Sequence, residues 1–421
     1  MQLITFAPIK KDLEMRNYWM IFLLCLTLFS VAQEDENAKI QLKLKGFAKA
    51  DYIFDSRQNV EGREGFYIIF PKPIERDANG IDINKKASAN QYGMTTRLGL
   101  EVKGTEIFKA QSSAFIEGDF TGPSNAHNNA LRLRHAYIKL QWTKTSFLMG
   151  QYWHPLDVPE MIPRVLSLNT GSPMHSFSRG PQIRITQQTG PVEWIAVAYA
   201  QRDFTSTGPE GSSSIYLRNG VVPDLSLLAQ WTRKSIFAGA GLNYKKLHFR
   251  SFTNDNQLMT DDVAALSALA YVKIQHQKWD VRVQTVWGEN LVDHLMLGGT
   301  AITQVDSLNA QITYSNISAI SAWSTIYYKI NKKIKVGVFG GYAQNLGGQN
   351  EIVGPSYARG ADIAYVYRFS PQWYYQIKNL IIANEWEYTV AGYGTPDEMG
   401  KVQNTYEVGN LRFTISLIYK F

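Results

Sequence analysis

Residues 40–54 read IQLKLKGFAKADYIF, and apolar and polar side chains alternate along them. Successive side chains of a β-strand point to opposite faces of its sheet, so this stretch predicts a strand with one apolar and one polar face. The strand would be longer than those of most soluble sheets. The apolar face carries Ile40, Leu42, Leu44, Gly46, Ala48, Ala50, Tyr52 and Phe54, and between them lie Gln41, Lys43, Lys45, Phe47, Lys49 and Asp51.

The final stretch of the sequence repeats the pattern, with Leu411, Phe413, Ile415, Leu417, Tyr419 and Phe421 on one face. Segments of the same kind occupy residues 92–103, 108–120, 192–201, 281–287, 334–345 and 360–369. Residues 131–142 depart from it, because Arg132 and Arg134 share a parity with Ile138, Leu140 and Trp142. We therefore expect a β-bulge there, or arginines outside the lipid zone.

The connections between these segments alternate in length. Short links fall near Gly104-Thr105, Thr143-Lys144, Thr189-Gly190, Arg233-Lys234, Gln275-Lys278, Asn331-Lys332 and Ser370-Pro371. Long links fall at 56–90, 121–129, 154–179, 203–222, 291–314, 346–358 and 392–407. Short periplasmic turns with long outer loops are typical of membrane barrels. If Ile236 to Phe252 form one strand, the number of strands is about sixteen, an even number as such barrels require. A split at Lys245-Lys246 would give an odd number of strands.

Composition favours the same architecture. Aromatic residues make up 13% of the chain, and the mean hydropathy is −0.22. Beyond residue 35 no apolar run approaches the roughly 20 residues that a membrane-spanning helix needs. We therefore predict an all-β fold, an antiparallel transmembrane β-barrel of about sixteen strands. The alternative is a soluble all-β protein, whose half-buried strands also alternate.

One apolar run, Met20 to Ala32 (MIFLLCLTLFSVA), lies near the N-terminus. Arg16 precedes it, and Ser30 and Ala32 are small residues at the positions that a signal peptidase requires. We predict a signal peptide over residues 1–32, cleavage before Gln33 and a barrel over 33–421. A membrane anchor is the alternative, but this run is too short to cross about 30 Å of hydrocarbon. Translation could start at Met1 or at Met15.

The only cysteine, Cys25, lies inside this run, so the mature chain would have no thiol chemistry. The bulky residues before Cys25 argue against a lipoprotein acceptor site. Removing residues 1–32 takes away three basic and two acidic residues, so the net charge changes from +7 to +6. The basic residues form no block, and we therefore expect no nucleic-acid binding.

Several short motifs resemble the DcaP-like group of trimeric porins of Gram-negative outer membranes. They are Leu131-Arg132-Leu133-Arg134-His135-Ala136-Tyr137, Gly150-Gln151-Tyr152-Trp153, Arg179-Gly180-Pro181-Gln182-Ile183-Arg184, Pro223-Asp224-Leu225 and Glu385-Trp386-Glu387-Tyr388-Thr389. The resemblance implies a sixteen-stranded homotrimeric barrel in outer-membrane lipid that passes small anionic solutes such as dicarboxylates. The terminal Leu417, Tyr419 and Phe421 resemble the signal that the barrel assembly machinery reads. Members of the group can carry a periplasmic helical extension, whereas only Gln33 to Ala38 precede the first strand here.

An inward-folded loop commonly narrows a wide barrel, and residues 154–179 are the best candidate. This segment carries Asp157, Glu160 and Arg164, which we assign to a pore constriction. Acidic groups on a loop that face basic groups on the wall create a transverse field that selects solutes by charge. The candidate basic wall consists of Arg97, Arg132, Arg134, Arg184, Arg250 and Arg282. Alternatively, these arginines only solvate the lumen or pair with Glu117 and Asp119.

Enzymatic functions find little support in the sequence. No Gly-x-Ser-x-Gly elbow is present, and the seven histidines have no metal-ligand spacing. The glycines around 337–341 are not followed by the Lys-Ser/Thr of a phosphate loop. We expect no cofactor and no metal. The remaining alternative is a loop-plugged barrel that serves as an accessory subunit of an outer-membrane assembly.

Overall fold

The alternating segments form one closed antiparallel sheet. The computed structural model describes residues 40–167, 171–253, 256–306 and 311–421, so the predicted signal peptide lies outside the described residues. Sixteen strands follow one another around the barrel, and the last strand pairs with the first. They are β1 (Gln41–Asp55), β5 (Arg97–Ile107), β6 (Ala110–Asp119), β7 (Arg132–Gln141), β8 (Thr145–Trp153), β9 (Arg179–Thr189), β10 (Val192–Tyr199), β13 (Asp224–Arg233), β14 (Ile236–Leu247), β15 (Val263–Gln275), β16 (Trp279–Glu289), β18 (Gln311–Lys329), β19 (Ile334–Gly348), β21 (Ile363–Ile377), β22 (Leu380–Pro396) and β23 (Val402–Lys420).

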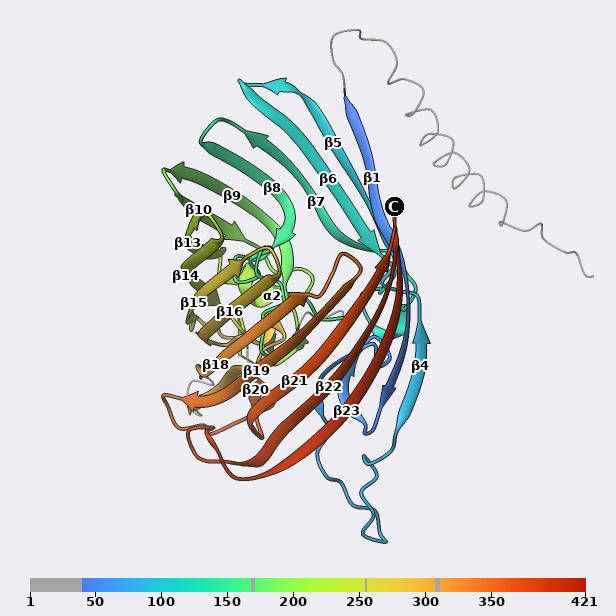
Figure 1. The fold of residues 1–421 in the computed structure, drawn as a ribbon. Helices are drawn as coiled ribbons and strands as arrows, with labels where there is room; N and C mark the ends of the chain where they lie inside the picture. Colours follow the sequence, from blue (N-terminus) through green and yellow to red (C-terminus); the bar gives the residue numbers. More distant parts are fainter. Residues whose placement is uncertain (1–39, 168–170, 254–255, 307–310) are drawn as a thin grey trace, which may run out of the picture.

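Shorter elements lie in the connections (Figure 1). The strand β4 (Ser88–Tyr92) pairs with β1 just ahead of β5, and β17 (Gly298–Asp306) with β20 (Ser356–Arg359) extends the sheet beyond the barrel wall. The others are β2 (Asn59–Gly62), β3 (Tyr67–Pro71), η1 (Asn125–His127), β11 (Thr207–Gly208), β12 (Gly211–Ser212), α2 (Ile215–Asn219) and η2 (Val292–His294). No described helix is both long and apolar enough to cross a membrane.

The two faces of the sheet have the predicted characters. On β23, the side chains of Leu411, Ile415 and Leu417 are 40 to 48% exposed on the outside of the barrel. The intervening Arg412 and Ser416 are buried inside. An apolar band around the outside and a polar inner face suit a barrel that spans a lipid bilayer.

The expected bulge in β7 is present. Glu117 on β6 opposes His135, whereas the next residue, Gly118, opposes Leu133, so Arg134 is an additional residue in β7. The bulge allows both Arg134 and His135 to point inward while the apolar side chains of the strand remain outside. This explains the irregular parity of residues 131–142.

Three predicted connections are wrong. The strand β5 continues through Gly104-Thr105 with a local irregularity, and the turn lies at Phe108-Lys109. Similarly, β21 continues through Ser370-Pro371, and the turn lies at residues 378–379. Residues 392–407 belong mainly to two long strands, with only 397–401 between them. The sequence analysis also missed the connection at 248–262, but the strand count is confirmed because β14 runs unbroken through Lys245.

Candidate functional site

The described residues of the segment between β8 and β9, 154–167 and 171–178, lie inside the barrel and contact strands that are remote from β8 and β9. Lys49 on β1 donates from Nζ to the carbonyl oxygen of Leu166 at 2.8 Å. Glu385 on β22 accepts a hydrogen bond from the backbone N–H of Leu166 at 2.6 Å. Arg282 on β16 donates from Nη1 to the carbonyl oxygen of Ile162 at 2.5 Å. Three strands that are not adjacent to β8 or β9 therefore hold the segment.

Further contacts extend along the same segment. Arg368 on β21 donates from Nη1 to the carbonyl oxygen of Ser172 at 3.0 Å and forms an ion pair with Glu387, with 3.2 Å between Nε and the carboxylate. The hydroxyl of Tyr327 on β18 hydrogen-bonds the carbonyl oxygen of Arg164. Because these donors lie on the inner wall, they replace the water that would otherwise solvate the backbone of the segment.

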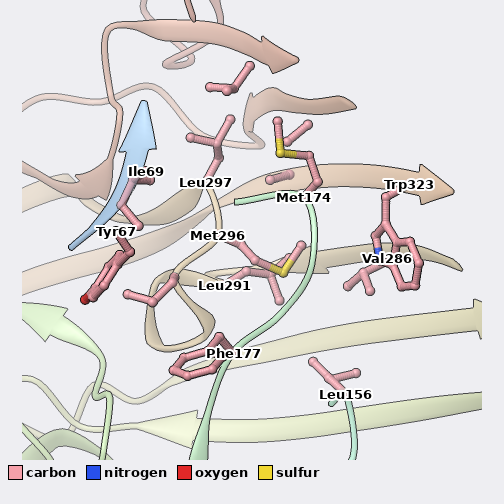
Figure 2. Close-up of a cluster of buried hydrophobic side chains, with 14 of the residues drawn as sticks. Tyr67, Ile69, Leu156, Met174, Phe177, Val286, Leu291, Met296, Leu297 and Trp323 are labelled. Atoms are coloured by element: carbon pink, nitrogen blue, oxygen red, sulfur yellow. The ribbon is translucent and has the colours of Figure 1, made fainter. Parts of the chain in front are cut away.

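Two more connections enter the barrel. Residues 65–71 are held by Arg412, which donates from Nη2 to the carbonyl oxygen of Gly65 at 2.7 Å, and by Tyr393, whose hydroxyl donates to the carbonyl oxygen of Pro71 at 2.7 Å. Residues 291–297 are all at most 4% exposed. Figure 2 shows how the apolar side chains of the three connections meet one another and the wall. Those labelled are Tyr67, Ile69, Leu156, Met174, Phe177, Val286, Leu291, Met296, Leu297 and Trp323.

The three predicted constriction residues lie in different surroundings. Asp157 is 1% exposed and accepts hydrogen bonds from the Ser178 backbone N–H at 2.6 Å and from the Ser176 hydroxyl at 2.9 Å. Burial raises the pKa of its carboxyl to about 7. Glu160 is exposed to two cavities, whereas Arg164 pairs from Nη2 with Asp280 at 2.7 Å. Asp157 therefore stabilises the fold of the segment, and only Glu160 and Arg164 border open space.

Three of the predicted wall arginines belong to one ion-pair network on β5, β6 and β7. Arg132 and Arg134 each approach Asp119, at 2.9 and 2.8 Å. Arg134 also pairs with Glu117 at 2.7 Å, and Arg97 approaches the same carboxylate at 3.7 Å. These pairs match the alternative in which the arginines neutralise inward-facing acids.

The other three predicted arginines lie apart. Arg184 on β9 donates from Nε to the side-chain oxygen of Gln182 at 3.2 Å and stacks over Tyr152, and among the described residues no carboxylate pairs with it. Arg282 pairs with Asp280 at 2.8 Å. Arg250 lies beyond the end of β14 rather than on the wall.

A cavity of about 570 Å³ opens between residues 162–167 and the inner wall, at the end of the barrel where the short turns lie. We call it the vestibule. Six cationic side chains line it, and none of its described lining residues is acidic. The six are Lys49, Arg97, Arg164, Lys333, Lys335 and Lys420.

A second cavity, of about 230 Å³, is lined by Pro159 and Glu160 of the segment and by residues of β7, β8, β9, β10 and β13. Its charged lining is mixed, with Lys139, Lys144 and Arg184 accompanied by Glu160 and Glu193. The excess of positive charge is therefore concentrated in the vestibule. In the described part of the chain no three His, Cys, Asp or Glu side chains lie close enough together to hold a metal ion.

Four of the six vestibule cations were not among the predicted site residues, because the predicted basic residues were all arginines. Lys49 and Lys420 have the polar parity of the first and last strands, so the alternation that predicted the strands already placed them inside. Lys335 likewise follows the inward parity of β19. Lys333 lies in a turn, where alternation gives no direction.

This architecture, a closed barrel with an apolar outer band and connections folded into its lumen, is that of outer-membrane β-barrels. Among solved structures the chain is similar to the outer membrane channel DcaP of Acinetobacter baumannii, with a TM-score of 0.65, 16% identity, and coverage of 91% of this chain and 97% of that one. The resemblance seen in the short motifs is thus confirmed at the level of the fold.

Two other solved structures share the barrel. One is the trimer form of OmpT, an outer membrane protein of Vibrio cholerae, with a TM-score of 0.54, 10% identity, and coverage of 91% of this chain and 99% of that one. The other is the anion-selective porin of Comamonas acidovorans, with a TM-score of 0.53, 8% identity, and coverage of 91% and 100%. No protein-family model and no curated protein sequence matches the chain.

Proposed function

We propose that this protein is an outer-membrane porin through which small hydrophilic anions diffuse passively, narrowed by residues 154–179. The observation that carries the proposal is the charge of the vestibule, because six cations and no acidic side chain are found among the described residues that border it. An anion that enters a narrow, poorly hydrated passage loses water and needs replacement donors, which lysine and arginine supply. The fold shared with DcaP and with an anion-selective porin supports this function.

The proposal includes a location and partners. Cleavage before Gln33 would deliver the barrel to the outer membrane, where the assembly machinery would bind the strand ending in Leu417, Tyr419 and Phe421. The exposed outer positions of these three side chains suit such contacts. The trimer form of OmpT supports a homotrimer for this chain.

Mass spectrometry of purified outer membranes should find an N-terminus at Gln33, and a mature chain that retains Met20 to Ala32 would contradict the signal peptide.

The reversal potential in a salt gradient tests the selectivity. Purified protein in a planar bilayer should conduct steadily and prefer anions, since the vestibule repels cations. Dicarboxylates such as succinate would be the solutes to test first, in liposome-swelling assays. A cation-selective channel would overturn the proposal.

A loop-plugged barrel is a second candidate, because the three inward connections share an apolar cluster (Figure 2). Apolar contacts of this kind exclude water, and ions do not cross a dry region. A plugged accessory barrel would insert into the bilayer, as antibody labelling can verify, yet give no steady conductance.

A further inference from the structure

We propose that the vestibule is a binding site for organic phosphate esters, in which a phosphate or diphosphate group contacts the lysines and an apolar body packs on residues 162–166. This inference deepens the proposed function, because it names an anion class for the vestibule of the same pore. It rests on unpaired positive charge, on the chemistry of lysine and on an apolar wall.

The first observation is the number of unpaired cations. Arg164 pairs with Asp280, Arg97 approaches Glu117, and Lys49 approaches Asp51 at 3.2 Å. For the other three cations, no ion pair or side-chain hydrogen bond occurs within the described part of the chain. These are Lys333, Lys335 and Lys420, which we call the lysine triad. A ligand that neutralises the triad must therefore carry more than one negative charge.

The second observation is the type of cation. The ammonium group of lysine is a compact charge with freely rotating donors, and lysine is a common phosphate ligand in that role. A phosphate monoester carries about 1.5 to 2 negative charges at neutral pH and offers three acceptor oxygens on one atom. A single carboxylate offers one charge and two oxygens. The triad therefore matches a phosphate group better than a single carboxylate.

The third observation is the apolar wall that faces the triad. Ile162, Pro163 and Val165 line the cavity from the segment, and Leu166 packs against Ile381 on β22. The rings of Tyr327 and Tyr374 border the same space, with their centroids 6.0 Å apart. A hydrated inorganic ion gains nothing from this surface, whereas an aryl or nucleoside body buries apolar area on it.

The geometry of the barrel determines the source of the ligand. The vestibule is lined by inward-facing residues, such as Lys49, which opposes Ile418, and Phe47, which opposes Lys420. Lipid headgroups lie on the outside, so the ligand is a dissolved ester. The volume of about 570 Å³ lies within the range of about 300–1,000 Å³ that is common for small-molecule sites.

Equilibrium binding to the detergent-solubilised barrel tests the inference without any need for conductance. Phenyl phosphate, inorganic phosphate and benzoate form a matched set, because inorganic phosphate lacks the apolar body and benzoate carries only one negative charge. In calorimetry, phenyl phosphate should bind more tightly than either of the other two anions. Its affinity should fall as salt is added. Replacing the triad together (K333Q, K335Q, K420Q) should weaken the binding of phenyl phosphate by between about threefold and about a hundredfold, the combined effect of three partly exposed charge contacts.

The control variant replaces three other lysines, which lie in short turns at the same end of the barrel but do not line the vestibule. They are Lys278, Lys332 and Lys378, and Lys332 is next to Lys333 in one turn. The variant K278Q, K332Q, K378Q should bind phenyl phosphate as the wild type does. Equal effects of the two variants, equal binding of all three anions, or no binding would each overturn the inference. Failure of conductance with intact binding would instead count against the porin alone.

Discussion

The hydrogen bond from Arg282 to the carbonyl oxygen of Ile162 offers a direct way to loosen the inward segment. In R282M the aliphatic part of the side chain is retained and the guanidinium group is lost. Asp280 does not become an unpaired buried carboxylate, because Arg164 still contacts it at 2.7 Å. The two tethers at Leu166 also remain, so only the part of the segment near Ile162 is released.

The size of the effect follows from the bond that is removed. A hydrogen bond in which one partner is charged contributes about 1.5–3 kcal/mol, and each 1.4 kcal/mol changes an equilibrium tenfold. The ratio of docked to undocked segment should therefore fall by between about tenfold and about a hundredfold. Because the wall strands keep their ladders, the stability of the barrel itself should change little.

Single-channel recording in planar bilayers measures this directly. R282M should show a larger mean conductance and more frequent current fluctuations than the wild type. K273M is the matched control, since Lys273 opposes Arg282 on the adjacent strand. Among the described residues its side chain has no hydrogen bond or ion pair to the segment. Wild-type current noise in R282M, or the same change in K273M, would refute the role of this tether.

Three further outcomes are expected. R184Q should shift the reversal potential toward cation selectivity without a change in thermal stability, because Arg184 has no described carboxylate partner. An unchanged reversal potential would show that Arg184 does not contribute to the selectivity. Deletion of Phe421 should lower the yield of heat-modifiable barrel in outer membranes, whereas wild-type yield would show that assembly does not depend on it. Burial raises the pKa of the Asp157 carboxyl to about 7 from its ordinary value of 3.8, so the folded segment binds a proton more tightly than the unfolded chain. The contribution of Asp157 to stability should therefore be fully present below about pH 4 and be lost as the pH rises through about 7. The difference in thermal stability between the wild type and D157N should accordingly change across this pH range, and a constant difference would contradict the assignment.

The barrel could be predicted from the sequence because every wall strand has one face toward lipid and one toward the lumen. That constraint makes alternation visible without any knowledge of contacts. Turn positions were harder to place. Gly104-Thr105 and Ser370-Pro371 are typical turn residues, yet both lie within strands, where local propensity is overridden by pairing with the neighbouring strands.

The interior could be predicted only in part. The inward course of residues 154–179 was expected from the length of the segment. The inward course of residues 65–71 depends instead on Arg412 and Tyr393, which lie hundreds of residues away in the sequence. That of residues 291–297 likewise depends on partners on other strands. Sequence spacing carries no signal for such contacts. The pairing of Arg132 with Asp119 was foreseen only as an alternative, because the sequence does not reveal which inward charges lie next to one another.

The additional residue in β7 also changes how the strand tolerates insertions and deletions. Elsewhere in β7, losing or gaining one residue would exchange the two faces and turn Lys139 from the lumen toward the lipid side. A lysine on the lipid face costs about 2–4 kcal/mol at the bilayer centre and about 0–1 kcal/mol near the interfaces. Deleting Arg134 alone would instead restore a regular ladder, with Leu133 still outside and His135 still inside. Position 134 is therefore a place where the length of the chain can vary by one residue without altering the lipid-facing surface. The charge that the lumen presents at this level can therefore change without any change to the wall around it.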